Sequence, residues 1–172
     1  DIGCGTGATL LTLSRIGQVV GLDSSRLALS FSRKRGVDRL VCGSAVKLPL
    51  ASRCADVVTM LDVLEHLDDD GAAMAEVSRI LKPGGIAILA VPAFPGLWSE
   101  HDEALGHRRR YTLAPLRALA IAAGLDVVKL SYVITALFFP IYLFRIAQRA
   151  LRRKRTQGPR TTLIVLPSIV NR

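Results

Sequence analysis

The sequence predicts an α/β fold built on a doubly wound, mostly parallel sheet, and three observations support this prediction. Segments with strand character alternate with segments in which apolar residues recur at helical spacing. Ala55–Leu61 is a continuous apolar run, which is typical of a parallel strand covered on both faces. Asp1, Asp23, Ser44 and Asp62 follow strand-like segments, at the sheet edge where such folds bind their ligands.

The predicted elements follow in a regular order along the chain. The expected helices, with capping or stop signals at their ends, are Ala8–Leu13, Ser24–Arg35, Asp69–Leu81 and Thr112–Ala123. The expected strands are Gln18–Asp23, Arg39–Ser44, Ala55–Leu61, Ile86–Val91, Leu125–Tyr132 and Thr161–Leu166. The alternation stops after Pro92, and we expect a polar and aromatic connection from Ala93 to Tyr111.

The chain begins with DIGCGTG, in which Gly3, Gly5 and Gly7 alternate with other residues. Glycine permits positive φ angles and a close approach of the backbone to a ligand. The predicted helix that follows points its free N–H groups at this turn, so the segment predicts a nucleotide-type binding loop. Such a loop needs a strand before it, and only Asp1 and Ile2 precede it here. We therefore expect the chain to be a fragment of a longer protein.

Length and composition indicate one globular domain with a basic second half. Apolar residues make up 50% of the 172 residues, which is enough for a core. Cys4, Cys42 and Cys54 show no metal-ligand spacing, which favours reduced thiols in a cytoplasmic protein. Up to Gly106, 10 basic and 13 acidic residues give a net charge of −3, and from His107 on 13 basic and 1 acidic residue give +12. A basic half is typical of proteins with anionic partners or high solubility.

The chain resembles the class I S-adenosylmethionine-dependent methyltransferases of the type 11 group, which includes ubiquinone-biosynthesis enzymes. The motifs that carry the resemblance, in family order, are DIGCGTG, Asp23, Gly43-Ser44-Ala45 with Leu48-Pro49-Leu50, Leu61–Leu67 and Leu81–Gly85. The resemblance implies a Rossmann-like class I methyltransferase fold, incomplete at both ends. It also implies methyl transfer from S-adenosylmethionine to a small or lipid-like acceptor.

The same resemblance implies which residues hold the S-adenosylmethionine cofactor. Asp23 would hold the ribose hydroxyls, and Asp1 suits the ammonium group of an amino-acid cofactor. Ser44 stands where the family usually has Asp on the adenine side, so we expect weaker binding there. The expected cofactor-binding residues are Asp1, Gly3, Gly5, Gly7, Asp23, Ser24, Ser44, Ala45, Leu61 and Asp62.

Two other functions stay open at this point. Gly3-x-Gly5-x-x-Ala8 also satisfies the glycine pattern of NAD(P)-dependent Rossmann oxidoreductases, with Asp23 in the place of their ribose-binding acid. Against this, Asp1 would face a pyrophosphate with like charge, and no hydride-transfer group is evident. A cofactor-binding module without catalysis is the second alternative, because no catalytic residue stands out.

The candidate catalytic residues are His66, His107 and Tyr111. Methyl transfer from a sulfonium needs mostly alignment, and it needs a base only where the acceptor loses a proton. Asp62, Glu65 and His66 would share one face of a helical turn. A similar cluster can hold a divalent cation in the ubiquinone-pathway O-methyltransferases. The alternative is that Glu65 and His66 only close the cofactor pocket, and we expect no metal.

We expect residues 1–132 to form the S-adenosylmethionine-binding domain, with residues 93–124 as an acceptor-side insertion. Residues 133–172 would form a C-terminal extension. Within the tail, Leu130–Phe144 carries no charge, and six basic residues follow it between Arg145 and Arg155. A membrane span needs about 20 apolar residues. We therefore weigh peripheral membrane contact through residues 130–155, at the cytoplasmic surface, against a helix packed on the domain. We expect no nucleic-acid partner, because no recognition module is evident.

Overall fold

The computed structural model describes residues 1–133, 139–140 and 142–143. In this part of the chain the helices are α1 (Ala8–Leu13), α2 (Arg26–Lys34), α3 (Asp70–Ile80), α4 (Glu100–Leu105) and α5 (Leu113–Ala122). Two short 3-10 turns are η1 (Leu64–His66) and η2 (Pro95–Leu97). The strands are β1 (Gly21–Asp23), β2 (Leu40–Cys42), β3 (Ala55–Leu61) and β4 (Leu81–Ala90). The predicted strand Thr161–Leu166 and the basic tail from Arg145 lie outside the described residues.

The segment around Ile2 joins two pairs of parallel strands into one sheet. β1 pairs with β2, and β3 pairs with β4, both in parallel. Ile2 forms parallel bridges to Leu22 of β1 and to Met60 of β3. Its backbone N–H donates to the Thr59 carbonyl at 2.8 Å, while Leu22 N donates to the Asp1 carbonyl at 2.8 Å. The strand order is therefore β2, β1, the Ile2 segment, β3 and β4, and the prediction of a parallel α/β sheet is confirmed.

Alternate residues of the central strands contact two different groups of helices. Ile2 and Leu22 belong to the larger core, together with side chains of α3 and α5. Gly21 faces the other way, because a Cβ on it would lie 2.4 Å from Leu10 of α1 and 2.9 Å from the sulfur of Cys4. Successive side chains of a strand point to opposite faces. Helices therefore cover both faces of the sheet at its centre, as the doubly wound prediction requires.

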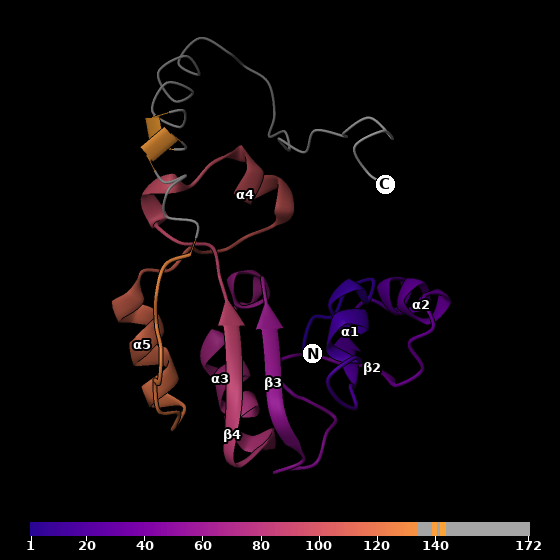
Figure 1. The fold of residues 1–172 in the computed structure, drawn as a ribbon. Coiled ribbons are helices and arrows are strands. Elements are labelled where there is room, and N and C mark those ends of the chain that lie inside the picture. Colours follow the sequence, from indigo (N-terminus) through magenta and orange to yellow (C-terminus); the bar gives the residue numbers. More distant parts are fainter. Residues whose placement is uncertain (134–138, 141, 144–172) are drawn as a thin grey trace.

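One face of β3 and β4 is covered by α3 and α5, which stand beside these strands in Figure 1. Met60 of β3 and Met74 of α3 are fully buried there. On the opposite face Val57 is 52% exposed and Ile86 is 60% exposed, whereas Thr59 is buried. The prediction that Ala55–Leu61 is covered on both faces is therefore wrong for the first half of β3 and holds only around Thr59. An apolar sequence indicates only that a strand can be buried. Whether both of its faces are covered depends on the helices that pack against the sheet.

Local capping signals place the helices within one or two residues of their predicted bounds. Ser25 caps α2, its Oγ accepting from Ala28 N at 3.2 Å. Asp69 caps α3 in the same way, accepting from Ala72 N at 2.8 Å. α5 follows Thr112, as predicted. These short-range contacts need no tertiary partner, which is why the sequence predicts them well.

Two strands differ from the prediction, because strand formation depends on partners that are distant in the sequence. β4 begins at Leu81 rather than Ile86, since Leu81 pairs with Ala55 across the sheet. The predicted strand Leu125–Tyr132 is wrong. The outer edge of β4 is unpaired among the described residues, but this segment does not pair with it and runs as irregular chain beside α5 (Figure 1). A β-rich run becomes a strand only where the chain places it in register along a sheet edge.

Helix α4 lies within the segment that we predicted to be an irregular connection. Its first turn is held by Asp102, whose Oδ2 accepts from Ser99 N at 2.9 Å and from Ser99 Oγ at 3.0 Å. Ser99 and Asp102 have the Ser-x-x-acid spacing of a capping box. This signal was available in the sequence and would have indicated the helix start.

Met60→Ala should lower the free energy of unfolding by about 2–5 kcal/mol, because it removes a fully buried side chain and leaves a cavity between β3 and α3. The control is Ile16→Ala, whose side chain is 85% exposed and should cost less than about 0.5 kcal/mol. Urea unfolding followed by circular dichroism measures both. Equal effects of the two changes would contradict the core described here.

Candidate functional site

A cleft of about 270 Å³ opens at the carboxyl ends of the central strands. Its walls come from the segments that follow the Ile2 segment, β1, β2 and β3, which is where open parallel sheets bind ligands. The lining residues are Gly3, Leu22, Asp23, Ser24, Gly43, Ser44, Ala45, Asp62, Val63, His66 and Leu67.

The cleft brings together most of the residues that the sequence predicted for cofactor binding. Those in its lining are Gly3, Asp23, Ser24, Ser44, Ala45 and Asp62. The predicted residues outside the lining are Asp1, Gly5, Gly7 and Leu61. The lining also contains the apolar residues Leu22, Val63 and Leu67, which were not predicted. An apolar residue has the same appearance in the sequence whether it faces the core or a ligand.

The Asp23 carboxylate anchors the glycine loop. Its Oδ2 accepts from Gly5 N at 2.8 Å, and its Oδ1 accepts from Ser25 N at 2.8 Å. Ser32 of α2 donates to the Gly5 carbonyl at 2.9 Å and holds the loop from the other side. A carboxylate offers about four lone-pair positions. Asp23 can therefore accept two further hydrogen bonds, as a ribose diol would require, while it keeps the loop in place.

Gly3 allows the loop to pass directly against the chain that follows β3. Its φ is +73°, and a Cβ built on it would lie 2.3 Å from Cγ2 of Val63. Any side chain at this position would therefore collide with the opposite wall of the cleft. Asp1, two residues before Gly3, lies outside the cleft lining. Its Oδ1 accepts a hydrogen bond from Thr59 Oγ1 at 2.7 Å.

Asp62 turns the chain sharply as it leaves β3. Its φ is +54°, which L-residues adopt rarely and Asp more readily than most. Its N–H donates to the Ala90 carbonyl at 2.9 Å, which ties this turn to the end of β4. A strained turn of this kind is typical of functional sites.

The prediction that Asp62, Glu65 and His66 share one helical face is wrong. Asp62 precedes the turn η1, and it lines the cleft together with His66. Glu65 is instead fully buried and outside the lining. The reason is that η1 is a single 3-10 turn, whose side chains do not follow the α-helical spacing.

The Glu65 side chain is fully buried and points away from the cleft lining. No described residue forms a hydrogen bond with either of its carboxylate oxygens. Burial raises the pKa of Glu65 to about 7. Both its protonated and its ionised forms are therefore populated near neutral pH.

His107 faces Glu65 and is oriented by Asp102. Its Nδ1 lies 3.0 Å from Asp102 Oδ1, and its Nε2 lies 4.0 Å from Glu65 Oε1. Burial opposes ionisation of Asp102, but hydrogen bonds from Arg110 and His107 outweigh it and lower the pKa of this carboxyl. An ionised Asp102 accepts a hydrogen bond from the Nδ1–H group of His107, which leaves Nε2 facing Glu65. The His66 ring meets that of His107 edge-on, with centroids 4.7 Å apart.

Glu65, His66 and His107 are the described residues that could together hold a metal ion. One ligand atom of each lies within 4.8 Å of the others. Two imidazoles and a carboxylate suit a transition metal better than Mg²⁺. The 4.0 Å between His107 Nε2 and Glu65 Oε1 exceeds the roughly 3.4 Å expected between two ligands of a tetrahedral ion with bonds of about 2.1 Å. The side chains would have to close in to bind one.

Tyr111 lies apart from the cleft lining. It is buried, and its hydroxyl donates to Asp70 Oδ2 at 2.7 Å. Burial and this hydrogen bond raise the pKa of the phenol above its usual value. Such a group keeps its proton at neutral pH, which suits a role in holding the structure.

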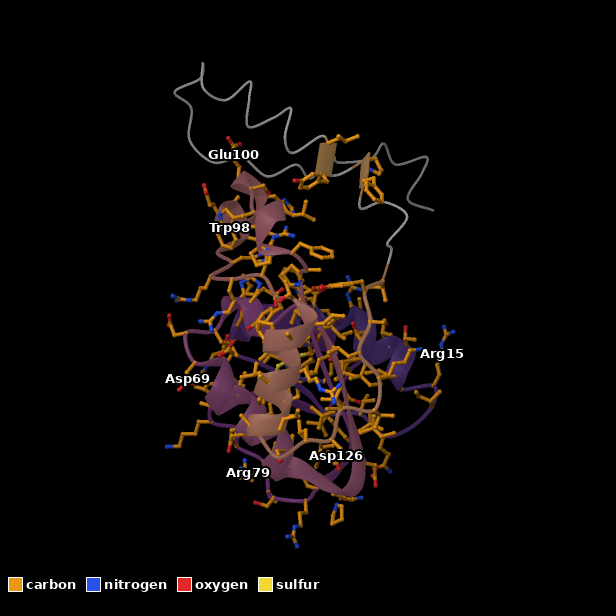
Figure 2. All side chains as sticks on the ribbon, turned by 90° about the vertical axis from the view of Figure 1, so that its left-hand side faces the viewer. Arg15, Asp69, Arg79, Trp98, Glu100 and Asp126 are labelled. Atoms are coloured by element: carbon orange, nitrogen blue, oxygen red, sulfur yellow. The ribbon has the colours of Figure 1, made fainter. Side chains whose placement is uncertain are left out.

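The segment expected on the acceptor side lies beyond the carboxyl ends of β3 and β4, toward which both arrows point in Figure 1. Figure 2 shows Trp98 and Glu100 at this end of the molecule and Arg79 and Asp126 at the opposite end. α4 and its flanking turns are therefore next to the edge that carries the cleft.

Comparison with known proteins assigns the family. The sequence profile of a methyltransferase domain matches residues 1–89, about half of the chain. The chain belongs to this family. The family resemblance seen in the sequence is thereby confirmed, and the cofactor of these enzymes is S-adenosylmethionine.

Among curated relatives, the demethylmenaquinone methyltransferase of Corynebacterium kroppenstedtii is 33% identical over 108 residues, covering 59% of this chain and 47% of that protein. A probable S-adenosylmethionine-dependent methyltransferase of Mycolicibacterium smegmatis is 31% identical over 132 residues, covering 74% and 51%. The chain thus spans about half the length of these relatives.

A solved structure supports the same fold. The chain is similar to an S-adenosylmethionine-dependent methyltransferase of Thermotoga maritima, described as a possible histamine N-methyltransferase. The TM-score is 0.62 and the identity 31%, over 72% of this chain and 61% of that chain. The Rossmann-like class I methyltransferase fold is confirmed.

Asp23→Ala should weaken S-adenosylmethionine binding by about 1.5–3 kcal/mol, the usual worth of hydrogen bonds to a charged group. This corresponds to about a ten- to hundredfold loss of affinity. Asp38→Ala is the control, because it removes the same charge from an exposed position outside the cleft. Titration calorimetry measures both variants. An Asp23→Ala affinity equal to that of Asp38→Ala would remove Asp23 from the site.

Proposed function

We propose that this chain carries the S-adenosylmethionine-binding domain of a methyltransferase that acts on a small or lipid-like acceptor. The observation that carries this proposal is the cleft, which sets the glycine loop, Asp23 and Ser44 around one space at the carboxyl edge of the sheet. Residues 1–132 would form the domain, with residues 93–124 on the acceptor side and residues 133–172 as an extension.

Each wall of the cleft would hold one part of the cofactor. Asp23 would accept hydrogen bonds from the ribose hydroxyls with the lone pairs that the loop leaves open. Ser44 and Ala45 would lie beside the adenine, and the loop from Asp1 to Gly5 would face the amino-acid part. When bound, S-adenosylmethionine supplies a methyl group already activated by its sulfonium. The protein therefore contributes mainly alignment of the acceptor.

His66 is our candidate for the group that takes a proton from the acceptor. It lines the cleft, in contrast to His107 and Tyr111. Burial lowers the pKa of His66, and the neighbouring His107 adds to this effect. The imidazole is therefore neutral at physiological pH and able to accept a proton. An acceptor such as a quinol, which the name of the demethylmenaquinone methyltransferase suggests, would lose a proton on methylation.

The protein should transfer the methyl group of labelled S-adenosylmethionine to a component of a quinone-containing lipid extract. EDTA should leave the rate largely unchanged, because no residue of the proposed mechanism requires a metal. Thin-layer separation of the labelled products measures the transfer. Cofactor binding without any transfer would favour a non-catalytic module. A loss with EDTA that a divalent ion restores would instead assign Glu65, His66 and His107 to a metal site.

We also propose that the C-terminal extension contacts a membrane surface. No helix in the described ranges is long and apolar enough to cross a bilayer. In the described part of the extension, large apolar side chains are nevertheless exposed: Phe139 is 71% exposed and Leu143 is 64% exposed. Basic residues follow them in the sequence, and each contributes about 1 kcal/mol near an anionic surface.

Changing Arg152, Arg153, Lys154 and Arg155 together to Gln should release much of the protein from anionic vesicles at low salt and leave cofactor affinity unchanged. The control changes three exposed basic residues at the end of α2, Arg33, Lys34 and Arg35, to Gln. Vesicle co-sedimentation at low and high salt measures both, because the electrostatic part fades as the Debye length shortens. Absence of sedimentation at low salt would show that the tail packs on its own domain.

A further inference from the structure

The cleft wall that follows β3 has little regular structure of its own. It runs from Asp62 to Asp68 and supplies the lining residues Asp62, Val63, His66 and Leu67. Within it, η1 covers only Leu64–His66. A single 3-10 turn leaves most of its carbonyl groups without a partner inside the turn. The shape of this wall therefore depends on contacts from elsewhere in the chain.

One distant segment supplies those contacts, and we call Arg108–Tyr111 the basic strap. Its polar atoms lie within 3.4 Å of five consecutive carbonyl oxygens of the wall and donate hydrogen bonds to four of them. Arg108 N donates to Glu65 O at 2.7 Å and Arg108 Nε to His66 O at 2.9 Å. Arg109 Nη2 donates to Leu67 O at 3.0 Å and to Asp68 O at 2.9 Å. Tyr111 Oη, whose proton is donated to Asp70 Oδ2, also lies 3.4 Å from Leu64 O.

Ion pairs fix the direction of these side chains. Arg109 Nη1 lies 2.9 Å from Asp70 Oδ2, which also accepts from Tyr111 Oη at 2.7 Å. Arg108 pairs with Asp68. The Arg109 guanidinium thus contacts two carbonyls and one carboxylate at once, and its planar fork of donors makes this possible. A lysine ammonium has no such fork.

The other end of the strap is tied to the chain that leaves β4. Tyr111 N donates to the Pro92 carbonyl at 2.9 Å, and Phe94 N donates to the Tyr111 carbonyl at 2.9 Å. Arg110 donates to the Ala93 carbonyl at 2.9 Å and pairs with the buried Asp102 at 2.7 Å. The strap is therefore held by the sheet edge on one side, and it holds the cleft wall on the other.

We propose that Arg109, supported by Arg108 and Tyr111, is a positioning residue that sets the shape of the cofactor cleft by holding the wall from Leu64 to Asp68. This inference deepens the proposed function and depends on it, because the cleft is taken as the cofactor site. Arg109 acts through the backbone of Leu67 and Asp68 and needs no contact with the cofactor.

The test compares Arg109→Ala and Arg109→Lys with the control Arg117→Ala, which removes an exposed arginine on α5. Hydrogen exchange of the amides in residues 62–68 is followed without cofactor, and calorimetry measures S-adenosylmethionine affinity. Arg109→Ala should speed exchange in the wall and weaken affinity by about tenfold, the worth of a charge-assisted hydrogen bond. Arg109→Lys should behave like Arg109→Ala within about threefold. The denaturation midpoint and the exchange of β3 should stay close to those of Arg117→Ala.

Three results would overturn the inference: unchanged exchange in the wall, full rescue by Arg109→Lys, or an equal gain of exchange throughout the sheet. Tyr111→Phe provides a second variant if Arg109→Ala does not fold, and it should change wall exchange in the same direction but by less. A wild-type protein that binds no S-adenosylmethionine would contradict the proposed function. The exchange data would then still report whether the strap holds the wall.

Discussion

The parallel bridging of the Ile2 segment between β1 and β3 is the constraint on which the rest of the structure depends. Gly3 N and Cys4 N donate to the Leu22 carbonyl, and Ile2 N donates to that of Thr59. These hydrogen bonds place the glycine loop at the middle of the sheet, where the neighbouring strands also end. The loop, Asp23, the segment after β2 and the turn after β3 then surround one cleft.

The two sides of the cleft are stabilised in different ways. On the glycine-loop side, a carboxylate and a serine hydroxyl from the adjacent β1 and α2 hold the backbone. On the side of η1, the backbone is held from residues more than 40 positions away. The first side can form as soon as β1 and α2 fold, whereas the second also requires the chain after β4 to return to the sheet edge.

Residues of like charge that are neighbours in the sequence pair with opposite charges in the fold. The run Asp68–Asp70 and the run Arg108–Arg110 are like-charged segments in the sequence. In the fold they interleave, and Arg108 and Arg109 pair with Asp68 and Asp70. Arg110 turns the other way, into the buried carboxylate of Asp102. Part of the positive charge of the second half of the chain is thus paired with acidic residues of the first half.

The sequence by itself determined what depends on neighbouring residues. It predicted the glycine loop, the capped helices α2 and α3, the strand Ala55–Leu61, and polar residues such as Asp23 at strand ends. Their signals are backbone freedom, capping and apolar spacing, which act over a few residues. Only the tertiary structure decided which face of β3 is covered, why Leu125–Tyr132 is no strand, and where Glu65 and Arg109 point. Those outcomes depend on pairing and burial between distant segments, which leave no local signal in the sequence.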